Sequence, residues 1–301
     1  MALEVQGRDL TRDVTVTLSG EKRIPLGAGQ SADIFRGKWK DQGQQKLVAI
    51  KHYRLALNDP PEIVEAVNRR LIRESQTWFD LDHPHVLPCY GLCDGLGLTV
   101  ALVCPLHLNG NILQYMSKVE CSSAVRLKFI NEIAAGLLYL HSRVPGVVHA
   151  DLHCGNILIN DQEQALLADF GRSKKIGIAG YTTALFCGST RHMAPELFPE
   201  ETPEGDEVDP DMIFCMATDM YAFAMVCFEI LTGNVPFKAL RYDYQVISAI
   251  RRSKRPEPTL EVQQSIPLDV WEIMYRCWNQ DPGQRPSAGE VVEFLAKVPV
   301  S

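Results

Sequence analysis

The sequence predicts an α+β fold in which a strand-rich first third precedes a helix-rich remainder. Up to about residue 104, short β-prone runs dominate, such as the buried run at residues 47–51. From about residue 110, apolar residues recur at i, i+3 and i+4, most regularly over residues 125–140, which indicates a buried helix. The change in composition near residues 104–110 therefore predicts two unequal lobes joined there.

Length and composition exclude several classes of protein. The chain has 301 residues with 46% hydrophobic and 22% charged content, which is ordinary for a globular protein with a proper core. A net charge of −7 argues against nucleic-acid binding, because phosphate contacts need a basic surface. No basic leader or membrane-spanning apolar run is visible, so we expect a cytoplasmic protein of undetermined oligomeric state. The nine scattered cysteines lack metal-ligand spacing and indicate reduced, buried thiols.

The first third is expected to be mainly strands. The first 20 residues are polar and predict a loose lead-in with some extended structure, and residues 24–37 predict a strand, a glycine turn and a second strand. A capping side chain and prolines at residues 58–62 mark the start of one helix, which carries Glu74. Two further strands are expected at residues 86–92 and 98–104.

The remainder is expected to be mainly helical. Asp219 opens a helix that is apolar on nearly all sides and stops at Gly233, which predicts the central core helix of this part. Further helices are expected near residues 243–252 and 268–278, and a last one begins at a capping box that starts at Ser287. Residues 172–188 and 199–211 lack periodicity and are expected to be loops.

One stretch carries the chemistry. Asp151 is followed five residues later by Asn156, and a second acid, Asp169, precedes Phe170. Magnesium-assisted phosphoryl transfer uses one carboxylate to orient the attacking hydroxyl, and an amide and a second carboxylate to hold the metal. The flanking runs are β-prone, so these polar groups are expected at the ends of short buried strands.

In these motifs the chain resembles the protein kinase catalytic domain over about residues 22–298, in particular the tyrosine-kinase-like branch of serine/threonine kinases. The matching motifs are the glycine turn, Val48-Ala49-Ile50-Lys51, His149-Ala150-Asp151 with Asn156, Asp169-Phe170-Gly171, Met193-Ala194-Pro195-Glu196 and Gln284-Arg285-Pro286. The resemblance implies a bilobal fold with a small antiparallel N-lobe sheet. It divides the chain into an extension (1–20), an N-lobe (21–104), a hinge (105–109) and a C-lobe (110–298).

The resemblance also implies roles for single residues. Asp151 would position the substrate hydroxyl, Lys51 would pair with the ATP phosphates and with Glu74, and Asn156 and Asp169 would hold Mg²⁺. The ATP site would be formed by Leu26, Gly27, Gly29, Ile34, Ala49, Lys51, Cys104, Leu106 and Leu158. Glu196 would pair with Arg285, and Asp219 would support the catalytic loop. The implied partner is a protein substrate, and Ser189 favours a serine or threonine acceptor.

Several residues depart from the family pattern. Ala32 replaces a glycine and Ser31 an aromatic residue of the phosphate loop, and Pro105 removes a hinge N–H. Ala150 replaces an arginine that commonly receives a loop phosphate, and His153 replaces a lysine near the γ-phosphate. These departures leave two alternatives open. One is a pseudokinase or scaffold that binds nucleotide without efficient transfer. The other is a kinase-like enzyme for small molecules, whose loop is similar at residues 149–156.

Overall fold

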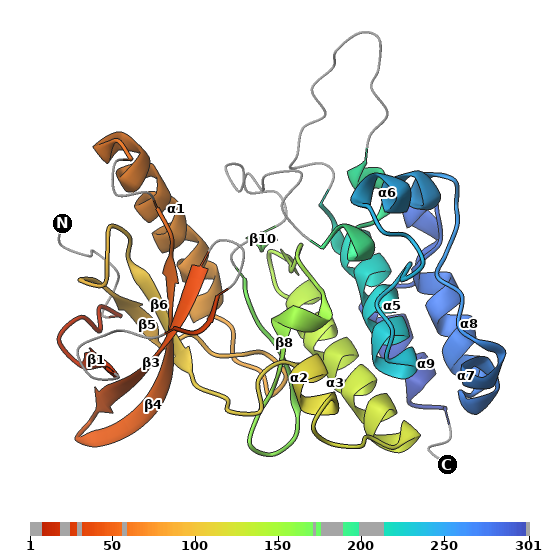
Figure 1. Ribbon diagram of the computed structural model, residues 1–301, viewed down its shortest axis with the longest axis horizontal. Helices are drawn as coiled ribbons and strands as arrows, with labels where there is room; N and C mark the ends of the chain where they lie inside the picture. The colour runs from red at the N-terminus through yellow and green to blue at the C-terminus, as the bar shows by residue number, and fades with distance from the viewer. Residues whose placement is uncertain are drawn as a thin grey trace, which may run out of the picture. The chain divides into compact units, whose positions relative to one another are not determined.

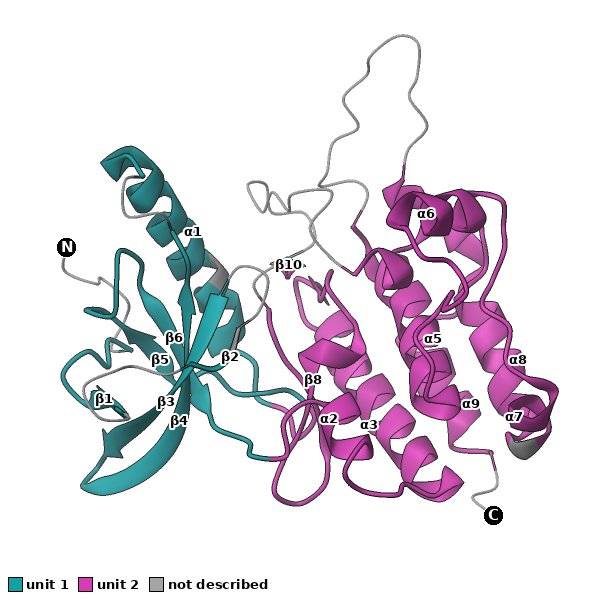
Figure 2. Ribbon diagram, in the orientation of Figure 1, with its two compact units in different colours: residues 1–82, 86–108 teal, residues 83–85, 109–301 magenta. Residues whose placement is uncertain are grey.

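The computed structural model describes residues 8–18, 25–28, 32–55, 59–170, 173–175, 189–198 and 214–298. It forms two compact units (Figure 2), one of residues Met1–Asp82 and Val86–Leu108 and one of His83–His85 and Asn109–Ser301. The first unit is an antiparallel sheet with one long helix, and the second is mainly helical (Figure 1). The predicted α+β class is therefore confirmed.

The first unit is built on a six-stranded antiparallel sheet. Its strands run in the order β1-β3-β4-β6-β5, and β2 pairs with the first part of β3, ahead of the part that pairs with β1. The elements of this unit are β1 (Val14–Val16), β2 (Pro25–Ala28), β3 (Ala32–Asp41), β4 (Gln44–Tyr53), α1 (Pro61–Phe79), β5 (Gly91–Cys93) and β6 (Ala101–Pro105). Side chains alternate along β4: Val48 and Ile50 are fully buried in the core of the sheet, whereas Ala49 and Lys51 point to the other face.

Two details of this unit differ from the sequence prediction, whereas the lead-in contains the extended structure that was expected. Residues 86–90 are not a strand, because this apolar run packs against the end of α1, where Trp78 Nε1 donates to Leu87 O at 2.5 Å. Pro60 occupies the N-cap position of α1 without a side-chain cap, so the predicted capping side chain is wrong, although Pro61 does begin the helix. The lead-in supplies strand β1, and Leu10 is buried in the core.

The second unit has helices on either side of a long buried helix, α5. Its helices are α2 (Ile112–Met116), α3 (Ser123–His141), α5 (Met216–Thr232), α6 (Asp243–Arg251), α7 (Leu260–Ser265), α8 (Leu268–Cys277) and α9 (Ala288–Leu295). Its short strands are β7 (Val147–Val148), β8 (Ile157–Ile159), β9 (Ala165–Leu167) and β10 (Lys174–Lys175), and its 3₁₀ turns are η1 (Cys154–Asn156), η2 (Thr190–His192), η3 (Pro195–Leu197) and η4 (Pro282–Gln284).

The longer helices of this unit follow the sequence pattern. Helix α5 packs against α3 and α8, and it ends at Gly233, which adopts the left-handed φ of 67° that favours glycine. It begins at Met216, three residues before the predicted start. The predicted capping box of α9 is confirmed, with Ser287 at the N-cap and Glu290 bonding back to it. The short helices α2 and α7 were not predicted, because five or six residues are too few to show a helical period.

Two predicted loops fall largely outside the described residues. The segment 199–211 lies wholly outside, and of residues 172–188 only 173–175 are described, where β10 pairs with β7.

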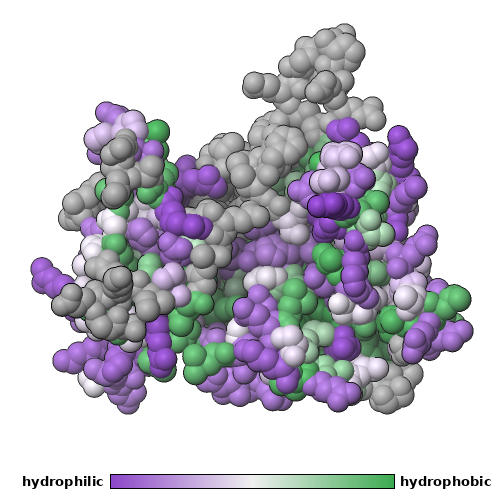
Figure 3. Space-filling view, in the orientation of Figure 1, coloured by the Kyte–Doolittle hydropathy of each residue, from purple (hydrophilic) through white to green (hydrophobic). Residues whose placement is uncertain are grey.

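The eight cysteines in the described part of the chain are all free, and seven of them are buried. Within the same described ranges, no helix combines the length and apolarity needed to cross a membrane. Hydrophilic and apolar residues are interspersed on the face shown in Figure 3, and those over α6 are mostly hydrophilic.

Candidate active site

The loop that carries Asp151 is held by a buried carboxylate in the first turn of α5. Asp219 is 1% exposed and accepts hydrogen bonds from His149 N (2.8 Å), Ala150 N (2.9 Å) and His141 Nε2 (2.9 Å). Ala150 has a φ of 63°, a left-handed conformation that costs a residue with a Cβ about 1–3 kcal/mol. The hydrogen bonds that the loop donates to Asp219 offset this strain, so the expected support of the loop by Asp219 is confirmed.

Asp219→Asn is expected to lower the free energy of unfolding by about 1–3 kcal/mol. The amide offers one acceptor oxygen in place of two and turns an N–H group toward other donors. Urea denaturation of the variant measures the change. Glu272→Gln, at an exposed acid on α8, is the control and should shift stability by less than about 0.5 kcal/mol. Equal stability of wild type and Asp219→Asn would contradict the assigned role.

A single buried imidazole joins this loop to the segment that leads to Asp169. His149 is fully buried, with Nε2 3.0 Å from Ala168 O and Nδ1 3.3 Å from Asp151 N. Because the carbonyl can only accept and the amide can only donate, the ring carries its proton on Nε2. The ring also packs on Phe170, with centroids 5.1 Å apart. His149 thereby fixes the backbone next to both acids.

The structure brings Asp151 and Asn156 together as the sequence spacing suggested. The side-chain nitrogen of Asn156 donates to the backbone oxygen of Asp151 at 2.9 Å and to its carboxylate at 3.4 Å. Asn156 is 8% exposed. With its nitrogen engaged, its side-chain oxygen accepts no hydrogen bond from any described residue. One amide thus orients the predicted acid and keeps an oxygen ligand available.

The hairpin of β8 and β9 brings Asn156 and Asp169 to the same end. The two strands pair with Ile157 opposite Leu167, and Ala168 N donates to Asn156 O at 2.9 Å. Asn156 precedes β8 and Asp169 follows β9, so both lie where the hairpin opens. A carboxylate and an amide oxygen are hard ligands of the kind that Mg²⁺ prefers, so the donor set fits this ion.

In the first unit, four of the predicted residues share one face of the sheet. Ile34 lies opposite Lys51, and Ala49 lies opposite Cys104, so all four side chains project from the side of the sheet away from its core. The Lys51 ammonium lies 5.0 Å from the ring centroid of Tyr53, on the same strand face. The structure therefore gathers Ile34, Ala49, Lys51 and Cys104 within this unit.

The other predicted site residues are less closely grouped. Leu26, expected in the ATP site, is 55% exposed on the edge strand β2, and its role there stays a prediction. Gly27 of β2 pairs with Ile34 of β3, but Gly29 lies outside the described residues. Leu106 follows β6 and is half-buried.

Two more predicted residues lie on separate elements. Leu158 is a half-buried residue of β8 in the second unit, where it forms a bridge with Asn111. Glu74 lies on α1, but its side chain is outside the described part of the structure, so its predicted pairing with Lys51 stays a prediction.

His153, one of the departures from the family pattern, is held as a neutral imidazole. Its Nδ1 accepts a hydrogen bond from Gly155 N at 3.1 Å, so a proton on Nδ1 would break this bond. Burial lowers the pKa of His153, and the nearby carboxylate of Asp151 only partly opposes this effect. The position therefore supplies no full positive charge near neutral pH, as expected from the sequence.

The lowered pKa of His153 predicts a loss of stability in acid. Between its folded pKa and the ordinary value of about 6.5, the unfolded chain binds a proton that the folded chain does not. The free energy of unfolding should therefore fall as the pH falls from 6.5 toward the folded pKa. In His153→Gln this contribution is absent, so denaturation curves at pH 7.5 and pH 5 should differ less than in wild type. If the free energies of unfolding of wild type and His153→Gln fell equally between pH 7.5 and pH 5, the lowered pKa assigned to His153 would be contradicted.

A second polar cluster lies beside this loop and was not found from the sequence. His192 Nδ1 lies 2.8 Å from Ser189 Oγ, and His192 Nε2 lies 3.1 Å from a carboxylate oxygen of Glu229. Burial acts to raise the pKa of Glu229, but hydrogen bonds from His192 and from the Cys154 thiol outweigh it, so the pKa is lowered. Burial raises the pKa of Cys154 well above its ordinary value. These residues are 35 or more positions apart in the chain except for Ser189 and His192, so no local motif joins them.

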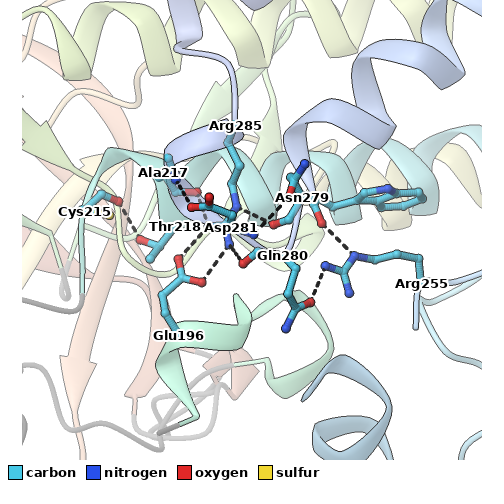
Figure 4. Close-up of polar contacts among 11 residues, drawn as sticks. Glu196, Cys215, Ala217, Thr218, Arg255, Asn279, Gln280, Asp281 and Arg285 are labelled. Carbon is cyan, nitrogen blue, oxygen red and sulfur yellow. Dashed lines mark hydrogen bonds and ion pairs between the residues drawn. The ribbon is translucent and has the colours of Figure 1, made fainter. Parts of the chain in front are cut away.

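The segment that follows Ser189 is anchored by an ion pair whose arginine is buried (Figure 4). Two nitrogens of Arg285 donate to the two carboxylate oxygens of Glu196, at 2.6 and 2.8 Å. The guanidinium also donates to the backbone oxygens of Ala217 (2.8 Å) and Asn279 (2.9 Å), and the Arg285 side chain is fully buried. The predicted pairing of Glu196 with Arg285 is confirmed, and it ties the segment to the first turn of α5 and to the loop before η4.

The fold and these anchors are those of a protein kinase domain. The family model described as protein tyrosine and serine/threonine kinase matches residues 21–295, and the chain belongs to this family.

Individual relatives are similar at modest identity. The chain is 29% identical over 283 residues to the probable serine/threonine-protein kinase drkD of Dictyostelium discoideum, which covers 90% of this chain and 19% of that protein. It is 27% identical over 273 residues to the serine/threonine-protein kinase TNNI3K of Mus musculus, covering 90% of this chain and 30% of that protein. It is 26% identical over 290 residues to the serine/threonine/tyrosine-protein kinase HT1 of Arabidopsis thaliana, covering 95% of this chain and 67% of that protein. The chain thus spans less than a third of drkD and TNNI3K.

Proposed function

We propose that this chain is a protein kinase that transfers the γ-phosphoryl group of ATP, with Mg²⁺, to serine or threonine hydroxyls of protein substrates. The observation that carries the proposal is the pair of Asp151 and Asn156. The pair lies on a strained loop held by Asp219, and Asp169 lies at the same end of the β8–β9 hairpin. Family membership over residues 21–295 supports the same activity.

In this proposal each polar group has one task. Asp151 orients the acceptor hydroxyl and accepts its proton, and its carboxylate is positioned by Asn156. Lys51, supported by Glu74, binds the ATP phosphates, while the glycine turn with Gly27 covers them. The site gains most of its rate enhancement by positioning groups and by charge stabilisation, because phosphoryl transfer needs little covalent chemistry from the protein.

Asn156 and Asp169 would hold the metal, through an amide oxygen and a carboxylate oxygen. Bound Mg²⁺ would neutralise charge on the phosphates of ATP. His153 adds no full charge near neutral pH, so more of the neutralisation is assigned to Lys51 and to the metal than in a kinase with lysine at this position.

The acceptor preference rests on Ser189 and on the relatives. Ser189 and Asp151 line the same small cavity, of about 20 Å³, so Ser189 lies in the neighbourhood of the proposed acid. The three relatives named above are all serine/threonine kinases by name, although HT1 is also named for tyrosine. We therefore assign serine and threonine as the main acceptors.

The test is a kinase assay on the purified chain with Mg²⁺-ATP and a generic protein substrate, followed by mass-spectrometric mapping of phosphorylated residues. The expected result is phosphoserine and phosphothreonine, with activity lost in Asp169→Asn. A wild-type chain that binds ATP but transfers nothing would support the scaffold alternative. ATP turnover stimulated by small metabolites and by no peptide would support the small-molecule alternative. Phosphotyrosine as the main product would overturn the acceptor assignment.

A further inference from the structure

Three chemically different metal-ligating groups meet beside the proposed catalytic loop. The Cys154 thiol, the His192 imidazole and the Glu229 carboxylate are all buried, and their ligand atoms lie within 4.8 Å of one another. They come from η1, η2 and α5, three elements of the second unit. The proposed phosphoryl transfer uses none of the three.

The distances are close to those of a tetrahedral metal site. With Zn–N and Zn–O bonds of about 2.0–2.2 Å, two ligand atoms of a tetrahedron lie about 3.3 Å apart. His192 Nε2 and the Glu229 oxygen are already 3.1 Å apart. The sulfur of Cys154 needs to lie about 3.5 Å from each of them. The sulfur lies within 4.8 Å of both atoms, so a side-chain movement of at most about 1.3 Å would bring it to this distance.

The surroundings of His192 match those of a metal-bound histidine. A ligating imidazole generally bonds a second group through its other ring nitrogen, which fixes the orientation of the ring. Here Nδ1 of His192 is 2.8 Å from Ser189 Oγ, while Nε2 faces Glu229. Glu229 is itself held on the long buried helix α5. Two of the three ligands are therefore oriented before any ion binds.

We propose that Cys154, His192 and Glu229 bind one Zn²⁺ ion. A thiolate and an imidazole favour Zn²⁺ over Mg²⁺, which prefers oxygen ligands. The charges balance, because a thiolate and a carboxylate neutralise the dication and leave no net charge in a buried place. On binding, the thiol proton leaves to solvent. The imidazole gives up its Nε2 proton and carries one on Nδ1, where it donates to Ser189 Oγ. A water molecule completes four-coordination.

The ion would tie the catalytic loop to α5. Cys154 lies between Asp151 and Asn156 in the chain, and His192 lies in the segment that follows Ser189. A bond from each to the same ion would restrain both segments against Glu229. We therefore expect Zn²⁺ to raise the thermal stability of the chain, independently of whether the chain transfers phosphate.

Cobalt and zinc titrations of the full chain, purified free of metal, test the proposal. Stoichiometric Co²⁺ should give the near-ultraviolet charge-transfer absorption of a cobalt–thiolate bond, one equivalent of Zn²⁺ should abolish it, and millimolar Mg²⁺ should not. Zn²⁺ should also raise the melting temperature. Cys154→Ser and Glu229→Gln should each weaken Zn²⁺ binding at least tenfold. Cys215→Ser, at a half-buried cysteine outside the cluster, is the matched control and should bind as wild type does.

Three results would overturn the site. They are the absence of thiolate absorption in wild type, its persistence in Cys154→Ser, and its loss in Cys215→Ser. If Cys154→Ser does not fold, the wild-type spectrum still shows whether a cobalt–thiolate bond forms, and Cys215→Ser still shows whether Cys215 supplies the thiolate. Absorption that needs several equivalents of Co²⁺ would indicate adventitious binding and would likewise overturn the proposal.

Discussion

Asp151→Asn is expected to lower kcat for phosphate transfer by about 100- to 10,000-fold while leaving the fold intact. In the proposed mechanism the Asp151 carboxylate accepts the proton of the hydroxyl, which an asparagine amide cannot do. An asparagine keeps the shape and keeps an oxygen for the hydrogen bond from Asn156. The backbone oxygen of Asp151, which accepts the shorter bond from Asn156, is unchanged. Chemistry should therefore be lost without a comparable loss of stability.

The measurement pairs steady-state kinetics with urea denaturation. Asp161→Asn, at an exposed acid in the turn between β8 and β9, is the matched control and should retain wild-type kcat. The KM for ATP should change little in Asp151→Asn, because the proposed role of the residue is toward the hydroxyl and not toward the nucleotide. Wild-type turnover in this variant would overturn the role of Asp151, and loss of activity together with unfolding would show that its role is structural.

Arg285→Ala is expected to lower the free energy of unfolding by about 3–5 kcal/mol, the largest effect on stability that we predict. Removing the buried guanidinium leaves the half-buried carboxylate of Glu196 without its partner. The guanidinium side chain is fully buried and holds Glu196, which is 22% exposed, with two bonds. It also holds the backbone oxygens of Ala217 and Asn279, which would lose a donor as well.

Two further variants separate charge from geometry. Arg285→Lys keeps the charge but cannot form the bidentate contact, so most of the loss should remain. Arg276→Ala removes an exposed arginine of α8 and should change stability by less than about 0.5 kcal/mol. Urea denaturation of Arg285→Ala, Arg285→Lys and Arg276→Ala measures these changes in the free energy of unfolding. If Arg285→Ala and Arg276→Ala have equal effects, the pair with Glu196 contributes nothing.

Elements with a long, regular pattern could be predicted from the sequence. Helix α3 and helix α5 have apolar residues spaced for burial, and the capping box at Ser287 marked the start of α9. Residues 86–90 show where this reasoning fails. A short apolar run is equally consistent with a strand and with a buried irregular segment, and its contact with Trp78 decided between them.

Part of the candidate site could be predicted because its residues lie close together in the sequence. Asp151 and Asn156 are five residues apart, so local structure alone brings them together, and their hydrogen bond follows from that spacing. The exposure of Leu26 could not be predicted, because an apolar residue on an edge strand has the same local pattern as one in the core. The pairing of Glu74 with Lys51 remains a prediction from the resemblance.

By itself, the sequence determined the fold class, the kinase motifs and their order, because periodicity, turn residues and short spacings encode them locally. Only the tertiary structure decided the left-handed backbone of Ala150 and the meeting of Cys154, His192 and Glu229. Both depend on groups far apart in the chain. Ala150 is held by Asp219, 69 residues away, and His192 is held by Glu229, 37 residues away. No local pattern carries such contacts, since they form only when the helices and turns pack together.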